Sequence, residues 1–267
     1  MASAIRLSGV SKRFLTQSGG VYTALRDLDM TVEAGEFCAV VGPTGCGKST
    51  TLGLISGLEP PSEGDIEVFE KPVKGIADGI GYVFQSDAVF PWKTVLENVA
   101  AGPRYRGLSR RDARAGAWDW IARVGLSGFE DRYPYQLSGG MRKRVALAQS
   151  LINGPRILLM DEPFSALDVQ TRSLMENELL NLWSATSASV VFVTHDLEEA
   201  ISLSDRVFVL TAGPGTVKSN YKVELPRPRN VAEIRFEPRF VEIYEEIWQD
   251  LRDEVLVSYE RQKRGAA

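Results

Sequence analysis

The fold of this chain is constrained most strongly by one glycine-rich segment, Gly42-Pro43-Thr44-Gly45-Cys46-Gly47-Lys48-Ser49-Thr50. The segment fits the pattern G-x-x-x-x-G-K-[ST], which is typical of loops that bind nucleotide phosphates. An apolar run over residues 36–41 precedes it and predicts a short strand, and the sequence from Ser49 onward predicts a helix. This context disfavours the alternative, a plain glycine-rich turn before a helix.

The residue types of this loop explain how it would hold phosphate. Glycines let the backbone curl so that successive N–H groups point inward, and the following helix adds its partly positive N-terminus. Lys48 supplies a mobile positive charge for the β- and γ-phosphates, and the Ser49 hydroxyl can hold Mg²⁺. The loop therefore predicts a nucleotide phosphate site, without saying which enzyme carries it.

Length and composition limit the class of protein. The 267 residues suffice for one large domain, or for one domain with a lobe. The net charge is −4, so no strong basic field favours a nucleic-acid partner. No apolar run approaches the roughly 18 residues of a membrane span, and the N-terminus lacks a signal-peptide pattern. We therefore expect a cytosolic protein that reaches a membrane only through a partner.

The two cysteines, Cys38 and Cys46, make no disulfide framework. Cys38 lies in a predicted strand. Cys46 lies in the phosphate loop, where it is either a small residue that fills the loop or a reactive thiol.

The first part of the chain predicts strands around the loop. Residues 5–14 and 21–32 alternate as two strands on either side of a Gly-Gly turn, and residues 65–69 form another strand after a helix over residues 48–58. Phe14 ends the first strand. An exposed aromatic side chain there could stack on a nucleotide base, but the residues alone favour a core position.

Polar residues follow two further predicted strands. Gln85 comes directly after a strand over residues 80–84, and His195, the single histidine of the chain, ends a β-branched strand over residues 189–194. In α/β sheets, ligand contacts lie at the carboxyl ends of parallel strands. Each residue taken alone is also compatible with a plain loop position.

Two carboxylates end the apolar run over residues 157–160, which predicts a parallel strand buried on both faces. Asp161 and Glu162 are costly at such a position unless they have a cation or a chemical role. Because adjacent strand residues point to opposite sides, we expect the two to act separately. One would face a metal and the other a reacting water.

The stretch from Asp87 to about Asn153 has a different character. Phe90-Pro91-Trp92 predicts a stiff apolar turn, Thr94 predicts the N-cap of a short helix, and Ser109 predicts the cap of a longer one. No convincing strand occurs in this stretch. It therefore predicts a helical lobe inserted between strands of the main sheet.

The segment Leu137-Ser138-Gly139-Gly140-Met141 precedes a predicted helix over residues 142–151. The free amides and the helix dipole at the N-terminus of such a helix can bind an anion. A plain serine N-cap with flexible glycines is the commoner arrangement, and the segment alone favours it.

The C-terminal part predicts a late hairpin over residues 206–225 and then a stiff linker, Pro226-Arg227-Pro228-Arg229-Asn230. A helix starting at Pro238 carries an apolar stripe formed by Phe240, Tyr244, Ile247, Trp248 and Leu251. The stripe is expected to pack on the body of the protein, with a partner surface as the alternative.

In this order, the features resemble one family, the ATP-binding cassette (ABC) ATPases, which are the nucleotide-binding subunits of ABC transporters. The resemblance covers about residues 4–225. It rests on the phosphate loop (Walker A), the Q-loop Gln85, the signature at residues 137–141, Walker B at residues 157–162, the D-loop Ser165-Ala166-Leu167-Asp168 and the switch His195.

The resemblance implies an α/β fold: a P-loop NTPase (RecA-like) core with an antiparallel β subdomain and an inserted α-helical subdomain. It implies that residues 1–87 and 156–225 form the nucleotide-binding core with the β subdomain. Residues 88–155 would form the helical signature subdomain, and residues 226–267 a C-terminal linker and helix.

The same resemblance implies ATP and Mg²⁺ as cofactors and a head-to-tail dimer, expected to be a homodimer. ATP would lie between the Walker A loop of one chain and Ser138-Gly139-Gly140 of the other. Glu162 resembles the base that polarises the attacking water, with Lys48, Gln85 and His195 as further catalytic residues and His195 on the γ-phosphate. Asp161 resembles the Mg²⁺ carboxylate, acting with Ser49 and Gln85.

Phe14 falls where the family places an adenine-stacking aromatic, which reverses the core interpretation, and Tyr22 is the second candidate. Met141 replaces the usual glutamine of the signature, which puts in doubt a contact from that side chain alone.

A finer resemblance comes from residues 90–99 together with the signature Leu-Ser-Gly-Gly-Met. Both are similar to the nitrate/sulfonate/taurine branch of bacterial importers. This implies a transmembrane permease docking near residues 85–92, an indirect solute-binding protein partner, and a place on the inner face of the cell membrane. A core turn is the alternative for Phe90-Pro91-Trp92.

Two other functions stay open as alternatives, a non-transport ABC ATPase acting on DNA or ribosomes and an exporter ATPase. The acidic composition and the lack of a basic arm disfavour the first. The importer-like segment disfavours the second. In such systems the binding protein and the permease select the transported substrate.

Overall fold

The computed structural model describes residues 3–16, 19–86 and 88–265. The predicted boundary residue Asp87 lies outside this part. In the part that is described, the strands form a six-stranded sheet, in the order β10-β9-β3-β8-β7-β6, and a four-stranded sheet, in the order β2-β1-β4-β5. None of the helices in this part is long and apolar enough to cross a membrane.

The larger sheet is parallel except at one edge, where β10 runs antiparallel to β9. Its central strands β3 and β8 are buried along their whole length, as their continuous apolar runs predict. The strands, in sheet order, are β10 (Val217–Lys222), β9 (Arg206–Leu210), β3 (Phe37–Val41), β8 (Ser189–Val193), β7 (Ile157–Asp161) and β6 (Ile80–Val83).

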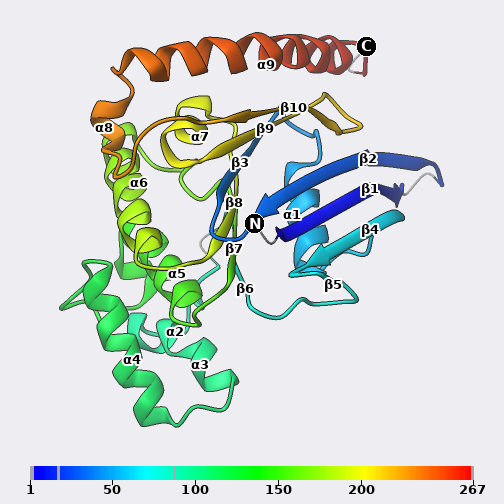
Figure 1. Cartoon of the computed structure of the whole chain (residues 1–267). Coiled ribbons are helices and arrows are strands. Elements are labelled where there is room, and N and C mark those ends of the chain that lie inside the picture. Colours follow the sequence, from blue (N-terminus) through cyan, green and yellow to red (C-terminus); the bar gives the residue numbers. More distant parts are fainter. Residues whose placement is uncertain (1–2, 17–18, 87, 266–267) are drawn as a thin grey trace.

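The smaller sheet is antiparallel and is drawn in blue (β1, β2) and cyan (β4, β5) beside helix α1 (Lys48–Ser56) in Figure 1. Alternate residues of β3 divide between two cores. Cys38 and Val40 face a core shared with α1 and this sheet, and Phe37 and Ala39 face a core shared with later helices. The strands are β1 (Ser3–Leu15), β2 (Val21–Glu33), β4 (Glu63–Val68) and β5 (Lys71–Pro72). The two predicted N-terminal strands are thus confirmed.

A helical lobe is inserted between β6 and β7, which are nevertheless neighbours in the sheet (Figure 1). The described residues between them form no strand, as predicted. The lobe has its own apolar core. Its helices are α2 (Val95–Val99), α3 (Ala101–Tyr105), α4 (Arg110–Arg123), the 3-10 turn η1 (Pro134–Gln136) and α5 (Gly139–Leu151).

The predicted caps of this lobe are confirmed. The Thr94 hydroxyl accepts a hydrogen bond from the Glu97 amide, and the Glu97 carboxylate accepts one from the Thr94 amide. The Ser109 hydroxyl accepts a hydrogen bond from the amide of Asp112 at the start of α4. Both helices therefore begin where a short polar side chain satisfies their first amides.

Helices α6 (Val169–Ser184) and α7 (Leu197–Leu203) cover the other face of the sheet, with α8 (Val231–Ile234) and α9 (Pro238–Gly265). The apolar stripe of α9 packs against α7, β9 and β10, as predicted, and α9 runs along the top of Figure 1. Phe240, Ile247 and Leu251 are buried, whereas Trp248 is 41% exposed and lies at the edge of the stripe.

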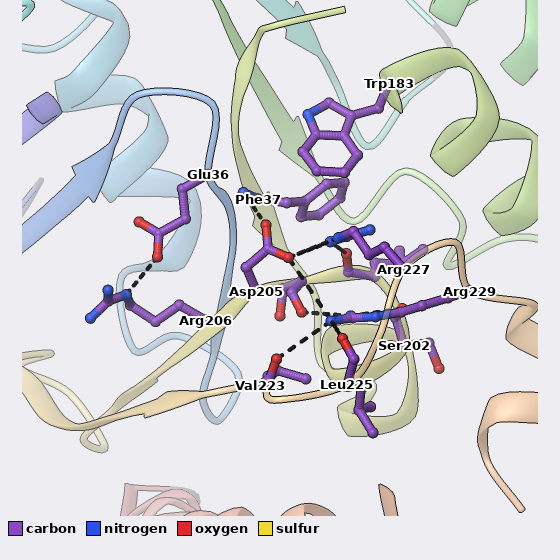
Figure 2. A network of polar contacts seen from close by, with 12 residues as sticks. Glu36, Phe37, Trp183, Ser202, Asp205, Arg206, Val223, Leu225, Arg227 and Arg229 are labelled. Carbon is purple, nitrogen blue, oxygen red and sulfur yellow. Dashed lines mark hydrogen bonds and ion pairs between the residues drawn. The ribbon is translucent and has the colours of Figure 1, made fainter. Parts of the chain in front are cut away.

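The arginines of the predicted stiff linker before α8 hold this segment against the body of the protein (Figure 2). Arg227 pairs with Asp205 at 2.7 Å and lies over the ring of Trp183. Arg229 is only 8% exposed, and burial lowers its pKa to about 10. Its guanidinium donates hydrogen bonds to the carbonyls of Ile201, Ser202, Ser204, Val223 and Leu225. The two prolines of this segment predict a stiff spacer. These contacts show that the segment is also anchored to the body of the protein.

Candidate active site

The glycine-rich loop connects β3 to α1, as predicted. Gly47 adopts a left-handed backbone (φ 99°) as the N-cap of α1, and a Cβ there would lie 2.5 Å from Leu25 Cδ2. Gly45 is left-handed as well (φ 79°). Only glycine satisfies both the backbone and the packing requirement at position 47.

Lys48 lies inside the loop, with 6% of its surface exposed. Its ammonium donates to the carbonyl oxygens of Gly42 at 2.8 Å and Pro43 at 3.2 Å. Cys46, a residue of the loop, has a buried side chain, and burial raises the pKa of its thiol. Since a reactive cysteine needs a lowered pKa and access, Cys46 fits the role of a loop-filling residue.

The Ser49 hydroxyl donates to Asp161 Oδ1 at 3.0 Å, which joins the start of α1 to the end of β7. Burial is the main cause that raises the pKa of Asp161, and the charge of Glu162 adds to it. A carboxylate whose charge is disfavoured by burial fits a nearby cation, and Mg²⁺ takes one or two carboxylates plus phosphate oxygens. Among the described residues no cluster of three or more His, Cys, Asp or Glu could hold a metal. A cation here would therefore use the hydroxyl and one carboxylate.

Glu162 and His195 lie together at the ends of β7 and β8. Glu162 Oε2 lies 3.1 Å from His195 Nδ1 and accepts a hydrogen bond from Gln85 Nε2 at 3.3 Å. Of the three residues predicted to hold Mg²⁺, Ser49 and Asp161 contact each other, whereas Gln85 contacts Glu162.

The two neighbouring carboxylates point to different partners, but strand alternation is not the reason. β7 ends at Asp161, and Glu162 has already turned into a left-handed backbone conformation (φ 42°). A left-handed glutamate is uncommon and is maintained only by surrounding structure. Here the Glu162 amide donates to the Val193 carbonyl at 2.9 Å.

One cleft of about 540 Å³ brings most of the predicted residues together. Phe14, half-buried, and Tyr22, about half exposed, line it with the loop, and the Tyr22 hydroxyl donates to the Gly45 carbonyl at 3.2 Å. The position of Phe14 fits the aromatic role better than the core role. The other lining residues are Ala24, Thr44, Gly45, Gly47, Lys48, Ser49, Thr50, Gln85, Glu162 and His195.

The signature segment does not line this cleft. The Ser138 hydroxyl accepts a hydrogen bond from the Met141 amide at 3.2 Å, so Ser138 is the N-cap of α5. The helix begins at Gly139, three residues before the predicted start. A Cβ at Gly140 would lie 3.1 Å from Thr171 Cγ2, which explains the small residue. A single chain therefore keeps its two glycine-rich segments apart.

Two functional candidates escape sequence reasoning. Lys143, which is buried, donates to the Gln85 carbonyl at 2.6 Å and supports the loop after β6. Arg172 contacts both the D-loop and the residue after His195. The sequence gives only a weak signal for such contacts, because a lysine or arginine near the start of a helix usually lies in solvent.

Glu176 gives the stability of the protein a dependence on pH. Burial, followed by the charges of Glu199 and Asp196, raises its pKa from 4.5 to about 8. Between these values the folded state holds a proton that the unfolded state has released, so stability is lost as the pH rises from 4.5 towards 8. Glu176→Gln removes this loss and is expected to raise the melting temperature at about pH 8 by a few degrees, with little change near pH 5. Thermal melting checks this, and an equal shift at both pH values contradicts it.

A parallel sheet with its phosphate loop between β3 and α1, and with catalytic candidates at the carboxyl ends of the neighbouring strands, defines a P-loop nucleoside triphosphatase. Within that class the match is specific. Residues 25–165 fit the family model described as ABC transporter, and the chain belongs to this family. The predicted family, fold class and ATPase activity are thereby confirmed.

Curated relatives cover almost the whole chain. The chain is 48% identical to the ABC transporter ATP-binding protein MJ0412 of Methanocaldococcus jannaschii, over 90% of this chain and 89% of the relative. It is 41% identical to the nitrate import ATP-binding protein NrtD of Synechocystis sp., over 93% and 95%. Aliphatic sulfonates import ATP-binding protein SsuB of Bacillus cereus is 39% identical over 96% of both chains. Taurine import ATP-binding protein TauB of Jannaschia sp. is 38% identical over 94% and 96%.

A solved structure agrees with the fold. The dimeric ATP-binding cassette MJ0796, in a post-hydrolysis state bound to ADP and Pi, has a TM-score of 0.74 and 31% sequence identity. The match covers 83% of this chain and 100% of that one.

Proposed function

We propose that this chain is the ATP-hydrolysing subunit that powers a bacterial ABC importer for small solutes of the nitrate, sulfonate or taurine kind. The observation that carries the proposal is the cleft, which combines the phosphate loop with the Glu162–His195 pair. Relatives named for the import of nitrate, sulfonates and taurine support the direction and the class of solute.

In this proposal ATP lies in the cleft, with its phosphates on the amides of residues 42–50 and on Lys48. The lysine can exchange its two carbonyl acceptors for phosphate oxygens without leaving the loop. The adenine stacks on Phe14, with Tyr22 beside it. Mg²⁺, held by Ser49 and Asp161 together with Gln85, which lines the same cleft as Ser49, would neutralise phosphate charge.

Hydrolysis in this proposal uses three residues that line the cleft, Glu162 and the two residues that contact it, His195 and Gln85. The Glu162 carboxylate accepts a proton from the attacking water and so polarises it. His195 contacts the γ-phosphate from the neighbouring strand and orients Glu162 through the 3.1 Å contact. Gln85 holds the same carboxylate oxygen and lies on the loop that leads into the lobe.

The site is completed by a second chain, placed head to tail. Ser138-Gly139-Gly140 lies outside the cleft of its own chain, although it forms the start of helix α5, where an anion could bind. A partner copy would bring this segment to the phosphates from the opposite side. The dimeric state of the MJ0796 cassette supports this assembly.

The proposed permease surface lies on the lobe after Gln85. Trp92 is 71% exposed and packs against Phe90, at a ring-centroid distance of 5.7 Å. It borders a groove of about 540 Å³ lined also by Lys93, Glu97, Ala100, Ala101, Arg104, Tyr105, Arg110 and Arg114. An exposed tryptophan beside such a groove fits docking of a membrane protein, which would hold the subunit at the inner face of the membrane.

Trp92→Ala is expected to uncouple hydrolysis from transport. The side chain lies away from the nucleotide cleft, so ATP binding and ATPase activity of the isolated subunit stay near wild type. In the assembled transporter the permease would bury Trp92, so loss of this aromatic anchor should lower solute uptake about tenfold or more. Uptake by the reconstituted transporter, measured together with its ATP consumption, checks this.

Trp118→Ala is the matched control, because Trp118 is an exposed tryptophan of the same lobe that does not line the groove. Its uptake should stay near wild type. Normal uptake with Trp92→Ala would exclude this docking surface. If the permease does not stimulate the ATPase activity of the wild-type subunit, the importer function itself is contradicted.

A further inference from the structure

Glu162 and His195 meet across a gap between two loops that leave different strands. Glu162 begins the loop that passes through the D-loop, residues 165–168, into α6. His195 lies in the short connection between β8 and α7. Their 3.1 Å contact therefore depends on how these two loops are held relative to one another.

Arg172, in the first turn of α6, contacts both loops. Its Nη2 donates to the carbonyl of Leu167 in the D-loop at 3.2 Å. Its Nη1 donates to Asp196 Oδ2 at 3.1 Å, and this residue directly follows His195. Its Nε lies 3.5 Å from Glu199 Oε1, as an ion pair rather than a hydrogen bond. A single planar guanidinium thus spans the two loops.

Hydrogen bonds within residues 194–199 hold the segment around His195 together. The Thr194 hydroxyl donates to Glu199 Oε2 at 2.6 Å and accepts from the Asp196 amide at 3.0 Å. Asp196 Oδ1 accepts from the amides of Glu198 and Glu199 at the start of α7. These contacts join residues 194–199 to one another, and Arg172 binds this segment through the Asp196 carboxylate.

The charges around Arg172 make its role hard to replace. Asp196 and the buried Glu199 lie beside it, and burial raises the pKa of Glu199 while Arg172 lowers it. Without the guanidinium these carboxylates would repel each other at low dielectric. A lysine would supply the charge but not the planar fork that donates to the two acceptors, Leu167 O and Asp196 Oδ2.

We propose that Arg172 is a positioning residue of the ATPase centre. It fixes the D-loop, residues 165–168, relative to the segment of residues 194–199, so that His195 stays in contact with Glu162. This inference rests on the proposed roles of Glu162 and His195. Arg172 does not line the nucleotide cleft, so it acts on hydrolysis and not on ATP binding.

The test is steady-state ATPase kinetics of the full chain carrying Arg172→Met. We expect kcat to fall about 10- to 100-fold with the KM for ATP within about twofold, because small misplacements of catalytic groups cost that much. Arg172→Lys should recover only part of the loss. Arg206→Met is the matched control: it removes a 2.8 Å ion pair with Glu36 that touches neither loop, and should keep wild-type kcat. Unchanged kcat with Arg172→Met, or an equal loss with Arg206→Met, overturns the proposal.

A double-mutant cycle separates positioning from general weakening. If Arg172 acts through His195, Arg172→Met should cause little further loss in a His195→Ala background, and additive losses overturn the proposal. Asp196→Asn covers the case that Arg172→Met does not fold, because asparagine keeps the helix cap while the ion pair is lost. It should lower kcat in the same way, and a wild-type kcat contradicts the inference. Full activity of His195→Ala alone would instead reject the underlying role of His195.

Discussion

Glu162→Gln is expected to lower ATP hydrolysis by about 10²- to 10⁴-fold while ATP binding survives. The amide keeps the shape of the side chain but cannot accept a proton from the attacking water. The phosphate loop and Lys48 are unaffected by the change, since Glu162 contacts Gln85 and His195 instead. Because the nucleotide is bound but not consumed, ATP-held dimers should accumulate. Phosphate release and light scattering with size exclusion measure the two effects.

Glu198→Gln is the matched control, because Glu198 lies near the site but pairs with Arg235 at the surface. It should hydrolyse ATP at the wild-type rate. If Glu162→Gln also turns over near the wild-type rate, the assignment of Glu162 as the base is wrong. If hydrolysis stops but no dimer forms with ATP, the head-to-tail assembly is contradicted instead.

Lys48→Ala is expected to lower the affinity for ATP itself by about 10- to 100-fold. This corresponds to the roughly 1.5–3 kcal/mol of a hydrogen bond that involves a charged group. The loss arises because the ammonium is buried inside the loop and no other group of the cleft replaces its charge there. Titration calorimetry with ATP under conditions without hydrolysis measures it.

Lys71→Ala, on the exposed strand β5, is the control and should bind ATP as wild type does. Because Lys48 also bonds the carbonyls of Gly42 and Pro43, thermal melting without nucleotide shows whether the loop itself is destabilised. Unchanged ATP binding by a folded Lys48→Ala protein would refute the phosphate role.

The parts of the fold that were predictable depend on local signals. The continuous apolar runs of β3, β7 and β8 indicate strands buried on both faces, and the sheet is parallel there. Thr94 and Ser109 indicate helix starts because their hydroxyls can satisfy the first amides. The loop pattern adds the order of strand, turn and helix. These signals are contained within a few consecutive residues, so they can be read without the tertiary structure.

The parts that were missed depend on contacts between distant residues. Lys143 bonds the Gln85 carbonyl and Arg172 bonds Asp196, and in both cases the partner lies on another element. Arg229 reads as part of a linker because proline spacing is visible, whereas its carbonyl acceptors are not. The backbone of Glu162 could not be anticipated either, since its left-handed turn is maintained by β8.

The candidate site was predictable in a different way. The residues alone left Phe14, Ser138 and His195 with two interpretations each, and the resemblance to the ABC family selected one. The structure brings Phe14 and His195 into the cleft and leaves Ser138 outside it. Their chemical roles, and the division of the chain into core, lobe and C-terminal segment, stay predictions.

The anchored arginine of residues 226–230 has a consequence for where this ATPase ends as a folding unit. Arg229 donates hydrogen bonds to five carbonyls, three at the C-terminal end of α7 and two just after β10. Helix α7 begins two residues after His195. A chain cut after Leu225 would leave these acceptors without their buried cation. The minimal autonomous ATPase therefore extends past the last strand of the sheet, and any fusion or affinity tag belongs beyond α9 rather than at the proline-rich segment.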